Sequence, residues 1–515
     1  MVWHSPDHLI LLKHPEVLVD QTLFGSSSEY FVLKIIGKGC FGTVAKCQNL
    51  ATKQIVAIKI LHEDTTYEKE VSVLKTISVL NPDNVNIVTF FEQFHHLGQK
   101  CLVFEMLDRN LYDHLKEQNW NPLSLNEIRP IAKQLLVALD ALKGLGIVHS
   151  DIKPDNIMFV NMQDQPLRVK LLDFGEAIPV SNIKLGMELQ PTGYRAPEVS
   201  LGLPFTEAID VWGVGCILAF LYLAENLFPV ECDYQMMKCM VEVLGQPEEH
   251  LLRAGLYTQY FFRVKKGAKH TAWRLMTPEE YLNANRVKPE ERNSFIELPS
   301  SLDDLLNFYP TREADEFKDR RAFVHLMKQL LHLEGDQRIS PSQALLHPFI
   351  SMSHLPDDPG GRAYLTSAQT LMSICPLEDF MVNISPHSPA GSYIQVRASA
   401  SAATVSYHSI PASWSSDRVL FTTCEKDRAA SFSDEDQAND SCEETQSLSY
   451  ASFTDGGPSC TYNQAVSPFD ETKPTDFISA APASHVPSKK LLSRIQTFFR
   501  HMKTFCCCWL PLVED

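Results

Sequence analysis

The sequence predicts an α+β domain followed by a C-terminal extension of different composition. Strand-like runs at residues 30–36 and 43–47 flank a glycine-rich turn, and a third such run follows at 56–59. The apolar run Val211–Leu223 is too short to span a bilayer and predicts a buried core helix. Strands that precede helices along a chain are typical of an α+β arrangement. With 515 residues, the chain is also too long for a single domain.

Charge and cysteine usage exclude several classes of function. The formal net charge is −17 at pH 7, which argues against direct nucleic-acid binding. The 13 cysteines are scattered apart from one cluster, and they lack the spacing of metal ligands. The N-terminus shows no signal-peptide pattern. We therefore expect an intracellular, reducing location.

Two linked segments carry the groups that phosphoryl transfer requires. Residues 149–156 read His-Ser-Asp-Ile-Lys-Pro-Asp-Asn, and an Asp-Phe-Gly tripeptide begins at Asp173. In such a set, Asp151 orients the attacking hydroxyl as the catalytic base, and Lys153 faces the transferred phosphate. Asn156 and Asp173 supply the hard oxygen ligands that Mg²⁺ prefers. Both signatures occur in the expected order and spacing, so a chance match is a poor explanation.

A glycine-rich hairpin and a lysine-bearing strand precede these segments. Residues 37–44 fit Gly-x-Gly-x-x-Gly-x-Val, which alone is compatible with a plain hairpin turn or a dinucleotide-binding turn. The following Val-Ala-Ile-Lys run favours a hairpin over nucleotide phosphates, with Lys59 on the α- and β-phosphates. The expected nucleotide-binding residues of this region are Gly37, Lys38, Gly39, Cys40, Phe41, Gly42, Val44, Ala57 and Lys59.

Lys59 needs a carboxylate partner from the next helix, and Glu70 and Glu68 are the two candidates. We select Glu70 because Leu74 lies one helical turn beyond it, as expected for a helix packed on the sheet. The interval from Lys59 to Glu70 is short. We hypothesise that this short link restricts the helix and favours the active arrangement.

Together these signatures resemble those of protein kinases, and Asp-x-Lys resembles the serine/threonine type. The stretches at 101–107, 110–112, 202–210 and 273–280 are similar to the homeodomain-interacting protein kinases, which neighbour the dual-specificity tyrosine-regulated kinases in the CMGC group. The resemblance covers about residues 30–355. It implies a bilobal fold with a small β-rich N-lobe and a larger helical C-lobe, ATP and Mg²⁺ as cofactors, and serine or threonine substrates. It further assigns the gatekeeper to Phe104 and the adenine-binding hinge to Met106 and Leu107.

The resemblance also assigns structural roles and a substrate preference. Glu198 is expected to form a buried ion pair with Arg338, and Asp210 is expected to hold the backbone of the 149–156 segment. Arg195 resembles the arginine that shapes a pocket for a proline after the phosphorylated residue. We therefore expect proline-directed phosphorylation at Ser/Thr-Pro sites in protein substrates.

Two departures from the family pattern concern regulation. Ser150 stands where many kinases, though not the homeodomain-interacting relatives, carry an arginine that receives an activation-loop phosphate. Glu188 occupies the position of the regulatory tyrosine in the homeodomain-interacting relatives. A glutamate supplies permanent negative charge, so it is one hypothesis that Glu188 replaces tyrosine phosphorylation. A solvated loop glutamate without a role is the open alternative.

The chain divides into four predicted regions: an N-terminal extension (1–29), the kinase domain (30–355), a disordered linker (356–487) and a terminal amphipathic helix with a cysteine cluster (488–515). The linker is rich in Ser, Ala and Pro, and it cannot bury enough apolar surface to order itself. In the last region, basic residues share a helix with an apolar face, which is formed by Leu491, Leu492, Ile495, Phe498, Phe499, Met502 and Phe505.

A basic amphipathic helix is typical of membrane-surface or calmodulin-like sensor targets. The adjacent Cys506, Cys507 and Cys508 favour S-palmitoylation and a membrane anchor. A helix that packs back on the kinase domain is the third possibility.

The sequence therefore predicts an ATP-dependent serine/threonine protein kinase in the cytoplasm, held peripherally at a membrane by its tail. The alternative function is a pseudokinase scaffold or signalling adaptor, against which the complete set of catalytic residues argues. Family resemblance implies a nuclear location and transcription-regulator partners as the alternative to the membrane.

Overall fold

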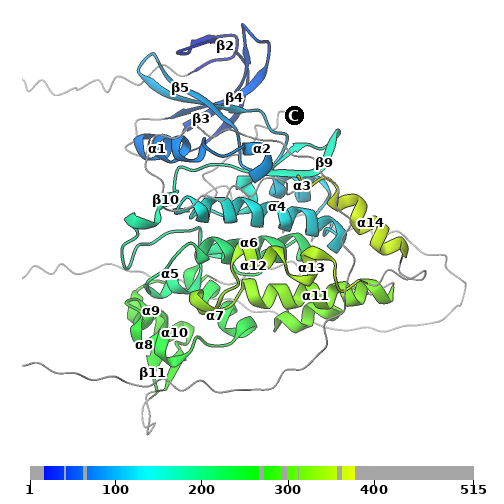
Figure 1. The fold of residues 1–515 in the computed structure, drawn as a ribbon. Coiled ribbons are helices and arrows are strands. Elements are labelled where there is room, and N and C mark those ends of the chain that lie inside the picture. The colour runs from blue at the N-terminus through cyan, green and yellow to red at the C-terminus, as the bar shows by residue number, and fades with distance from the viewer. Residues whose placement is uncertain are drawn as a thin grey trace, which may run out of the picture. The chain divides into compact units, whose positions relative to one another are not determined.

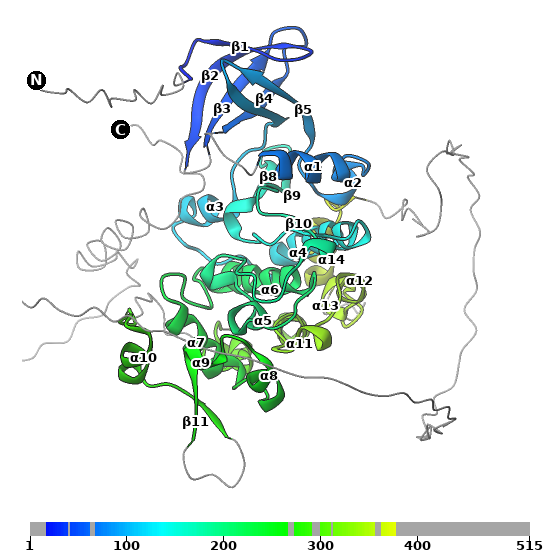
Figure 2. The ribbon, with the colours of Figure 1, turned by 90° about the vertical axis from the view of Figure 1, so that its left-hand side faces the viewer.

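The computed structural model describes residues 17–39, 42–61, 67–265, 272–290, 299–310, 313–355 and 362–376. These residues form a β-rich lobe and a larger helical lobe (Figure 1), as the family resemblance implies. The same two layers are visible after a quarter turn, with the sheet above and the helices below (Figure 2). None of the helices in these ranges is both long and apolar enough to cross a membrane.

The β-rich lobe is built on a six-stranded antiparallel sheet in the order β1-β2-β3-β4-β6-β5. The central strand β4 is almost continuously apolar and buried, which suits a strand with neighbours on both sides. The strands are β1 (Thr22–Phe24), β2 (Glu29–Lys38), β3 (Gly42–Asn49), β4 (Ile55–Leu61), β5 (Phe90–His96) and β6 (Gln99–Glu105). The three strand-like runs predicted from the sequence are therefore confirmed.

Two helices accompany this sheet, α1 (Tyr67–Ile77) and α2 (Pro82–Val85). The buried residues of α1 recur at helical spacing, which places Glu70 on the same inward face as Leu74. Glu68 is exposed. The periodicity of this helix thus decides which glutamate can reach the interior.

The helical lobe carries most of the remaining elements. Its helices are α3 (Leu111–Glu117), α4 (Leu125–Gly144), α5 (Pro197–Leu201), α6 (Ala208–Leu223), α7 (Asp233–Leu244), α8 (Glu249–Ala254), α9 (Thr258–Phe261), α10 (Pro278–Asn285), α11 (Ala314–Leu330), α12 (Pro341–Leu345), α13 (Pro348–Ser351) and α14 (Arg362–Met372). Three antiparallel strand pairs join them, namely β7 (Ile147–Val148) with β10 (Ile178–Pro179), β8 (Ile157–Asn161) with β9 (Gln165–Leu171), and β11 (Phe262–Val264) with β12 (Trp273–Leu275).

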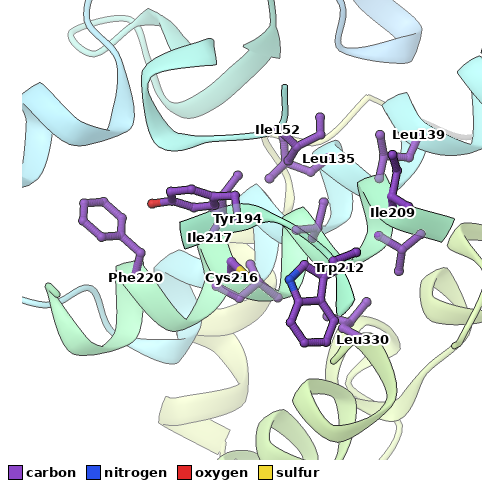
Figure 3. Packing of buried hydrophobic residues seen from close by; sticks show 14 of the residues in the cluster. Leu135, Leu139, Ile152, Tyr194, Ile209, Trp212, Cys216, Ile217, Phe220 and Leu330 are labelled. Carbon is purple, nitrogen blue, oxygen red and sulfur yellow. The ribbon is translucent and has the colours of Figure 1, made fainter. Parts of the chain in front are cut away.

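Helix α6 forms the centre of the helical lobe, where every residue from Ile209 to Leu223 is buried. This confirms the core helix predicted over Val211–Leu223. Side chains from α4, α11 and the 149–156 segment gather around it (Figure 3). The Trp212 ring stacks on Phe228 with ring centroids 5.6 Å apart.

Two glycines let neighbouring segments approach α6 closely. A Cβ atom added at Gly213 would lie 2.8 Å from the Cβ atom of Ile152, and one at Gly215 would lie 2.7 Å from Cδ2 of Leu331. Side chains at these positions would displace their neighbours. Gly213 therefore brings the 149–156 segment directly onto the buried helix α6.

The structure extends the folded domain beyond both predicted boundaries. Within the predicted N-terminal extension, β1 pairs with β2, and Val17 and Leu23 are buried in the sheet core. Within the predicted disordered linker, α14 buries Leu365 and Ala368. The Tyr364 hydroxyl donates to Asp319 at 2.8 Å. These short elements are ordered because a small apolar face suffices once an existing core offers a surface.

Candidate active site

The buried carboxylate of Asp210 on α6 holds the backbone of the 149–156 segment. Asp210 Oδ2 accepts the His149 backbone N–H at 2.7 Å, and Oδ1 accepts the Ser150 N–H at 2.9 Å. Burial raises the pKa of Asp210 to about 7, and these two hydrogen bonds oppose the rise. The prediction that Asp210 holds this backbone is confirmed.

Asp151 is oriented by two neighbours from its own segment. Lys153 Nζ donates to Asp151 Oδ2 at 2.9 Å, and Asn156 Nδ2 donates to the same oxygen at 2.7 Å. Asn156 Nδ2 also donates to the Asp151 carbonyl at 2.8 Å. Because both side-chain donors use Oδ2, Oδ1 is the oxygen that can accept a hydrogen bond from a substrate hydroxyl.

The other amide atom of Asn156 has a different environment. Asn156 Oδ1 is buried and has no hydrogen-bond partner among the described residues. A buried acceptor without a partner is costly unless a ligand satisfies it. An amide oxygen of this kind, together with a nearby carboxylate, fits the oxygen ligands that Mg²⁺ requires.

Lys59 connects the two lobes through a buried charge cluster. Its Nζ atom lies 2.9 Å from Glu70 Oε1 on α1 and 2.9 Å from Asp173 Oδ1. The sequence proposed the pairing with Glu70 over Glu68, and the geometry agrees with that choice. It did not predict that Asp173, 114 residues further along the chain, shares the same ammonium group.

The charges of this cluster shift one another's pKa values. Burial alone would lower the pKa of Lys59, but the carboxylates of Asp173 and Glu70 outweigh burial and raise it. Burial would raise the pKa of Asp173, yet the Lys59 ammonium lowers it to about 2. Burial raises the pKa of Glu70, against the attraction of Lys59. Asp173 is therefore the carboxylate that stays firmly ionised and suited to a cation.

The backbone around Asp173 is held in an uncommon conformation. Asp173 has φ 62°, in the left-handed region that non-glycine residues rarely adopt. The next residue, Phe174, is buried and packs edge-on against His149, with ring centroids 4.9 Å apart. His149 Nδ1 accepts the Asp151 N–H at 3.2 Å, so its protonated Nε2 donates to the Leu172 carbonyl at 3.1 Å. His149 thus links the 149–156 segment to the Asp-Phe-Gly turn.

An apolar cavity opens beside Lys59 between the two lobes. Six residues that the sequence assigned to nucleotide binding line it, namely Val44, Ala57, Lys59, Phe104, Met106 and Leu107. Sequence reasoning missed the lining residues Ile36, Val88, Glu105, Met158 and Leu172. Met158 and Leu172 lie within two residues of Asn156 and Asp173, and this proximity to the motifs is the signal that could have identified them.

The glycine-rich hairpin contributes to the cavity only in part. Gly37, Lys38, Gly39 and Gly42 are described but do not line the cavity, whereas Cys40 and Phe41 lie outside the described residues. A Cβ atom added at Gly42 would lie 2.3 Å from the Ile60 carbonyl oxygen. Gly42 is therefore required by the pairing of β3 with β4, a reason that the glycine motif alone does not reveal.

A second buried ion pair lies in the helical lobe. Arg338 donates to both carboxylate oxygens of Glu198, at 2.6 and 2.9 Å. Its remaining N–H groups donate to the carbonyls of Ala208 and His332 at 2.8 to 3.1 Å. The predicted Glu198–Arg338 pair is confirmed.

The two regulatory positions of the 173–198 segment differ in their contacts. Arg195 donates to the carbonyls of Leu189 and Gln190 at 3.0 to 3.3 Å. Glu188 is exposed and forms neither a hydrogen bond nor an ion pair within the described residues. The structure therefore favours the interpretation of Glu188 as a solvated loop residue.

Comparisons with known proteins agree with the interpretation of this site as a kinase active site. Residues 30–350 match the family model described as the protein kinase domain. Homeodomain-interacting protein kinase 2 of Mus musculus is 40% identical over 370 residues, which cover 70% of this chain and 31% of the relative. Homeodomain-interacting protein kinase 4 of Homo sapiens is 38% identical over 352 residues, which cover 65% of this chain and 57% of the relative.

A nematode relative extends the same comparison. Homeodomain-interacting protein kinase 1 of Caenorhabditis elegans is 39% identical over 366 residues, which cover 68% of this chain and 43% of the relative. The chain thus spans about a third to just over half of the length of these relatives. Because the family model covers more than half of its 515 residues, the chain belongs to the protein kinase family.

Proposed function

We propose that this protein is an ATP-dependent serine/threonine protein kinase. The observation that carries the proposal is the position of Lys59, which contacts Glu70 and Asp173 at the wall of the apolar cavity. A smaller adjoining cavity is lined by Lys59, Asp173 and Asp151. A nucleotide whose base fills the apolar cavity therefore directs its phosphates toward Asp151.

The residues around the cavity account for each requirement of the transfer. Lys59 would neutralise the nonreacting phosphates, and Lys153 would neutralise the transferred group. Oδ1 of Asp151 would accept the hydrogen bond of the substrate hydroxyl and take its proton late, as the hydroxyl oxygen bonds to phosphorus and ADP leaves. The main contribution of Asp151 is orientation, because the transition state is loose.

Magnesium fits the oxygen atoms present at the site. Asn156 Oδ1 is buried without a partner, and Asp173 is ionised, so these two residues would hold the cation. The cation would supply charge neutralisation between the phosphates. Asn156 belongs to the segment that is anchored on α6, and Asp173 precedes the Phe174 ring that packs against His149. These contacts fix the positions of both residues before a nucleotide or cation binds.

The test is transfer of the γ-phosphate to peptides by the full-length protein and by D173N and D151N variants. D164N is the matched control, since Asp164 lies in the exposed turn between β8 and β9. We expect both active-site variants to lose transfer and D164N to retain it. A wild type that transfers no phosphate but still binds partners would instead indicate a pseudokinase scaffold. Phosphoproteomics of wild type against D173N would identify the substrates.

A preference for proline after the phosphorylated residue is supported by Arg195. Gln190 has φ 68°, and Arg195 engages its carbonyl, so this oxygen is not available to a substrate N–H. A substrate residue with an N–H at this point would leave its donor unpaired, whereas proline has none. A peptide library with each residue after the target serine would show enrichment of proline. Equal use of all residues would overturn the preference.

The proposal also concerns the partners of the whole protein and its location in the cell. The relatives are named for interaction with homeodomain proteins, and we propose transcription regulators among the partners. The linker and tail lie outside the described residues. From the sequence, we propose that the basic tail helix and Cys506–Cys508 attach a cytoplasmic kinase to membranes, with the nucleus as the alternative.

Replacing all three cysteines by serine tests this attachment. We expect the variant to move from the membrane pellet to the soluble fraction, because stable anchoring needs acyl chains in addition to a basic patch. Calcium-dependent binding of a tail peptide to a calmodulin-like sensor would favour the alternative role of the tail. Nuclear recovery of the wild type would overturn the membrane location.

A further inference from the structure

One backbone oxygen in the 173–198 segment receives two side-chain donors from different elements. The Ser150 hydroxyl donates to the Glu176 carbonyl at 2.9 Å, and Lys69 Nζ on α1 donates to the same oxygen at 3.2 Å. A carbonyl oxygen has two lone pairs, so these two donors satisfy it fully. The 149–156 segment, α1 and the segment after Asp173 therefore meet at a single atom.

Ser150 is itself held in place at its backbone. Its N–H donates to Asp210, and its φ of 63° lies in the left-handed region. Such a conformation costs about 1 kcal/mol for a non-glycine residue and persists where the surroundings impose it. The direction of the Ser150 hydroxyl is thus set by α6 through Asp210.

The Glu176 carbonyl lies close in sequence to both carboxylates of the Lys59 cluster. Lys69 immediately precedes Glu70, and Glu176 follows Asp173 by three residues. Lys59, Glu70, Asp173 and Glu176 also line the same small cavity. The contact between Lys69 and Glu176 therefore joins α1 to the segment after Asp173. Lys59 joins the same two parts of the chain through Glu70 and Asp173.

The contact that Ser150 makes with the segment after Asp173 requires no phosphate group. The kinase signature carries arginine at this position, and arginines can order an activation loop by pairing with its phosphate. A neutral hydroxyl cannot form that ion pair, and here it binds the backbone of the segment directly. Lys69 adds a charged donor, which makes a stronger hydrogen bond than a neutral one.

We propose that Ser150 and Lys69 are positioning residues whose shared contact with the Glu176 carbonyl holds α1 and the 173–198 segment in the transfer-competent arrangement without phosphorylation. This inference rests on the proposed kinase function. Neither residue is placed against the nucleotide, the metal or the substrate. Both residues therefore act by changing the fraction of molecules in which Lys59 contacts both Glu70 and Asp173.

Steady-state kinetics of full-length S150A, K69M and S150A/K69M variants test the proposal. We expect kcat to fall about 5-fold in S150A and about 10-fold in K69M, with the KM for peptide unchanged. The double variant should lose more than the product of the two single effects, since either donor alone still holds the carbonyl. K69R should remain within about twofold of the wild type, because a guanidinium can make the same contact.

K75M is the matched control, since Lys75 lies on the exposed face of α1. Hydrogen exchange supplies a readout that does not depend on activity. The amide of Ala177, which donates to the Phe174 carbonyl at 3.2 Å, and the amides of α1 should exchange faster in S150A/K69M than in K75M. Phosphatase-treated wild type should keep its kcat.

The outcomes separate the two proposals. Wild-type kcat and exchange in S150A/K69M would overturn the positioning role while leaving kinase function intact, and loss of kcat on dephosphorylation would overturn phosphate independence. If no variant transfers phosphate, the proposed function fails, whereas faster exchange in the double variant still supports the contact. If S150A does not fold, the comparison of K69M with K69R and K75M carries the test.

Discussion

Two of the buried ion pairs among the described residues, at Arg338 and at Lys59, use their cations in opposite ways. Arg338 in the helical lobe directs all five N–H groups to protein acceptors, with both carboxylate oxygens of Glu198 among them. Its guanidinium also lies over the Trp212 ring, 5.2 Å from the centroid. Lys59 divides a single ammonium between Glu70 and Asp173, which belong to different lobes.

The difference shows how one fold separates stability from chemistry. A planar guanidinium with every donor satisfied fixes its surroundings and has nothing left for a ligand. An ammonium with three N–H donors, two of which go to Glu70 and Asp173, keeps one N–H at the wall of the cavity. We therefore expect changes at Lys59 to affect activity first and changes at Glu198 to affect stability first.

The largest effect is expected from K59M. Removal of the ammonium should lower γ-phosphate transfer by about 10³-fold, about 4 kcal/mol, because the phosphates lose a charged donor in a water-poor site. Peptide phosphorylation measures the loss. K34M on the exposed side of β2 serves as control and should keep full activity. Equal activity in K59M and K34M would show that Lys59 does not touch the nucleotide.

The next effect is expected from E198Q, which leaves the Arg338 guanidinium buried without its carboxylate. Loss of one partner of a buried pair costs about 3 kcal/mol. E207Q weakens the Lys143–Glu207 pair, in which the lysine is exposed and the glutamate half-buried with a contact of 2.8 Å, and should cost less than about 1 kcal/mol. Urea denaturation of both variants measures the contrast. Similar losses would mean that burial does not distinguish the two pairs.

Arg195 lies between the two extremes, because its guanidinium binds carbonyls in the segment that we propose contacts the substrate. R195K keeps the charge but loses the paired donation to Gln190, so the preference for proline should fall about 5-fold. Rates on matched Ser-Pro and Ser-Ala peptides measure the preference. An unchanged ratio in R195K would remove Arg195 from substrate selection, whereas equal loss on both peptides would indicate a structural role.

The smallest effect concerns a pair of histidines in which His347 is buried and His325 is exposed. His347 Nδ1 accepts the Phe349 N–H at 3.2 Å, and its Nε2 lies 2.8 Å from Nδ1 of His325. Burial and the charges of His325 and His354 lower the pKa of His347 to about 4. Between this pKa and its unfolded value of about 6.5, the unfolded chain binds more protons, so stability falls as pH decreases from 7 to 4.

H347N should flatten this dependence, since asparagine keeps an acceptor for the Phe349 N–H at the start of α13 but does not titrate. We expect wild type to lose about 1 kcal/mol more stability than H347N between pH 7 and pH 5. Thermal unfolding at both values measures the difference. Parallel losses in the two proteins would assign the pH dependence to other groups.

Local patterns in the sequence predicted much of the site. The spacing of Val71 and Leu74 was enough to place Glu70 on the inward face of α1, and the motif order located Asp151, Lys153, Asn156 and Asp173. The sequence did not predict α14, because this helix has too little apolar surface to predict a stable helix without its packing on α4. The effect of the short link before α1 stays a prediction, since residues 62–66 lie outside the described ranges.

The sequence by itself determined the membership in a family, the identity of the reacting side chains and the strands and helices that carry them. These depend on residue type and on spacing within one element, which a sequence displays directly. Only the tertiary structure decided that Asp173 shares Lys59 with Glu70, that Asn156 Oδ1 is left without a partner, and that Ser150 and Lys69 meet at Glu176. Such contacts join elements separated by up to 114 residues, and their geometry depends on how the lobes pack rather than on any local pattern.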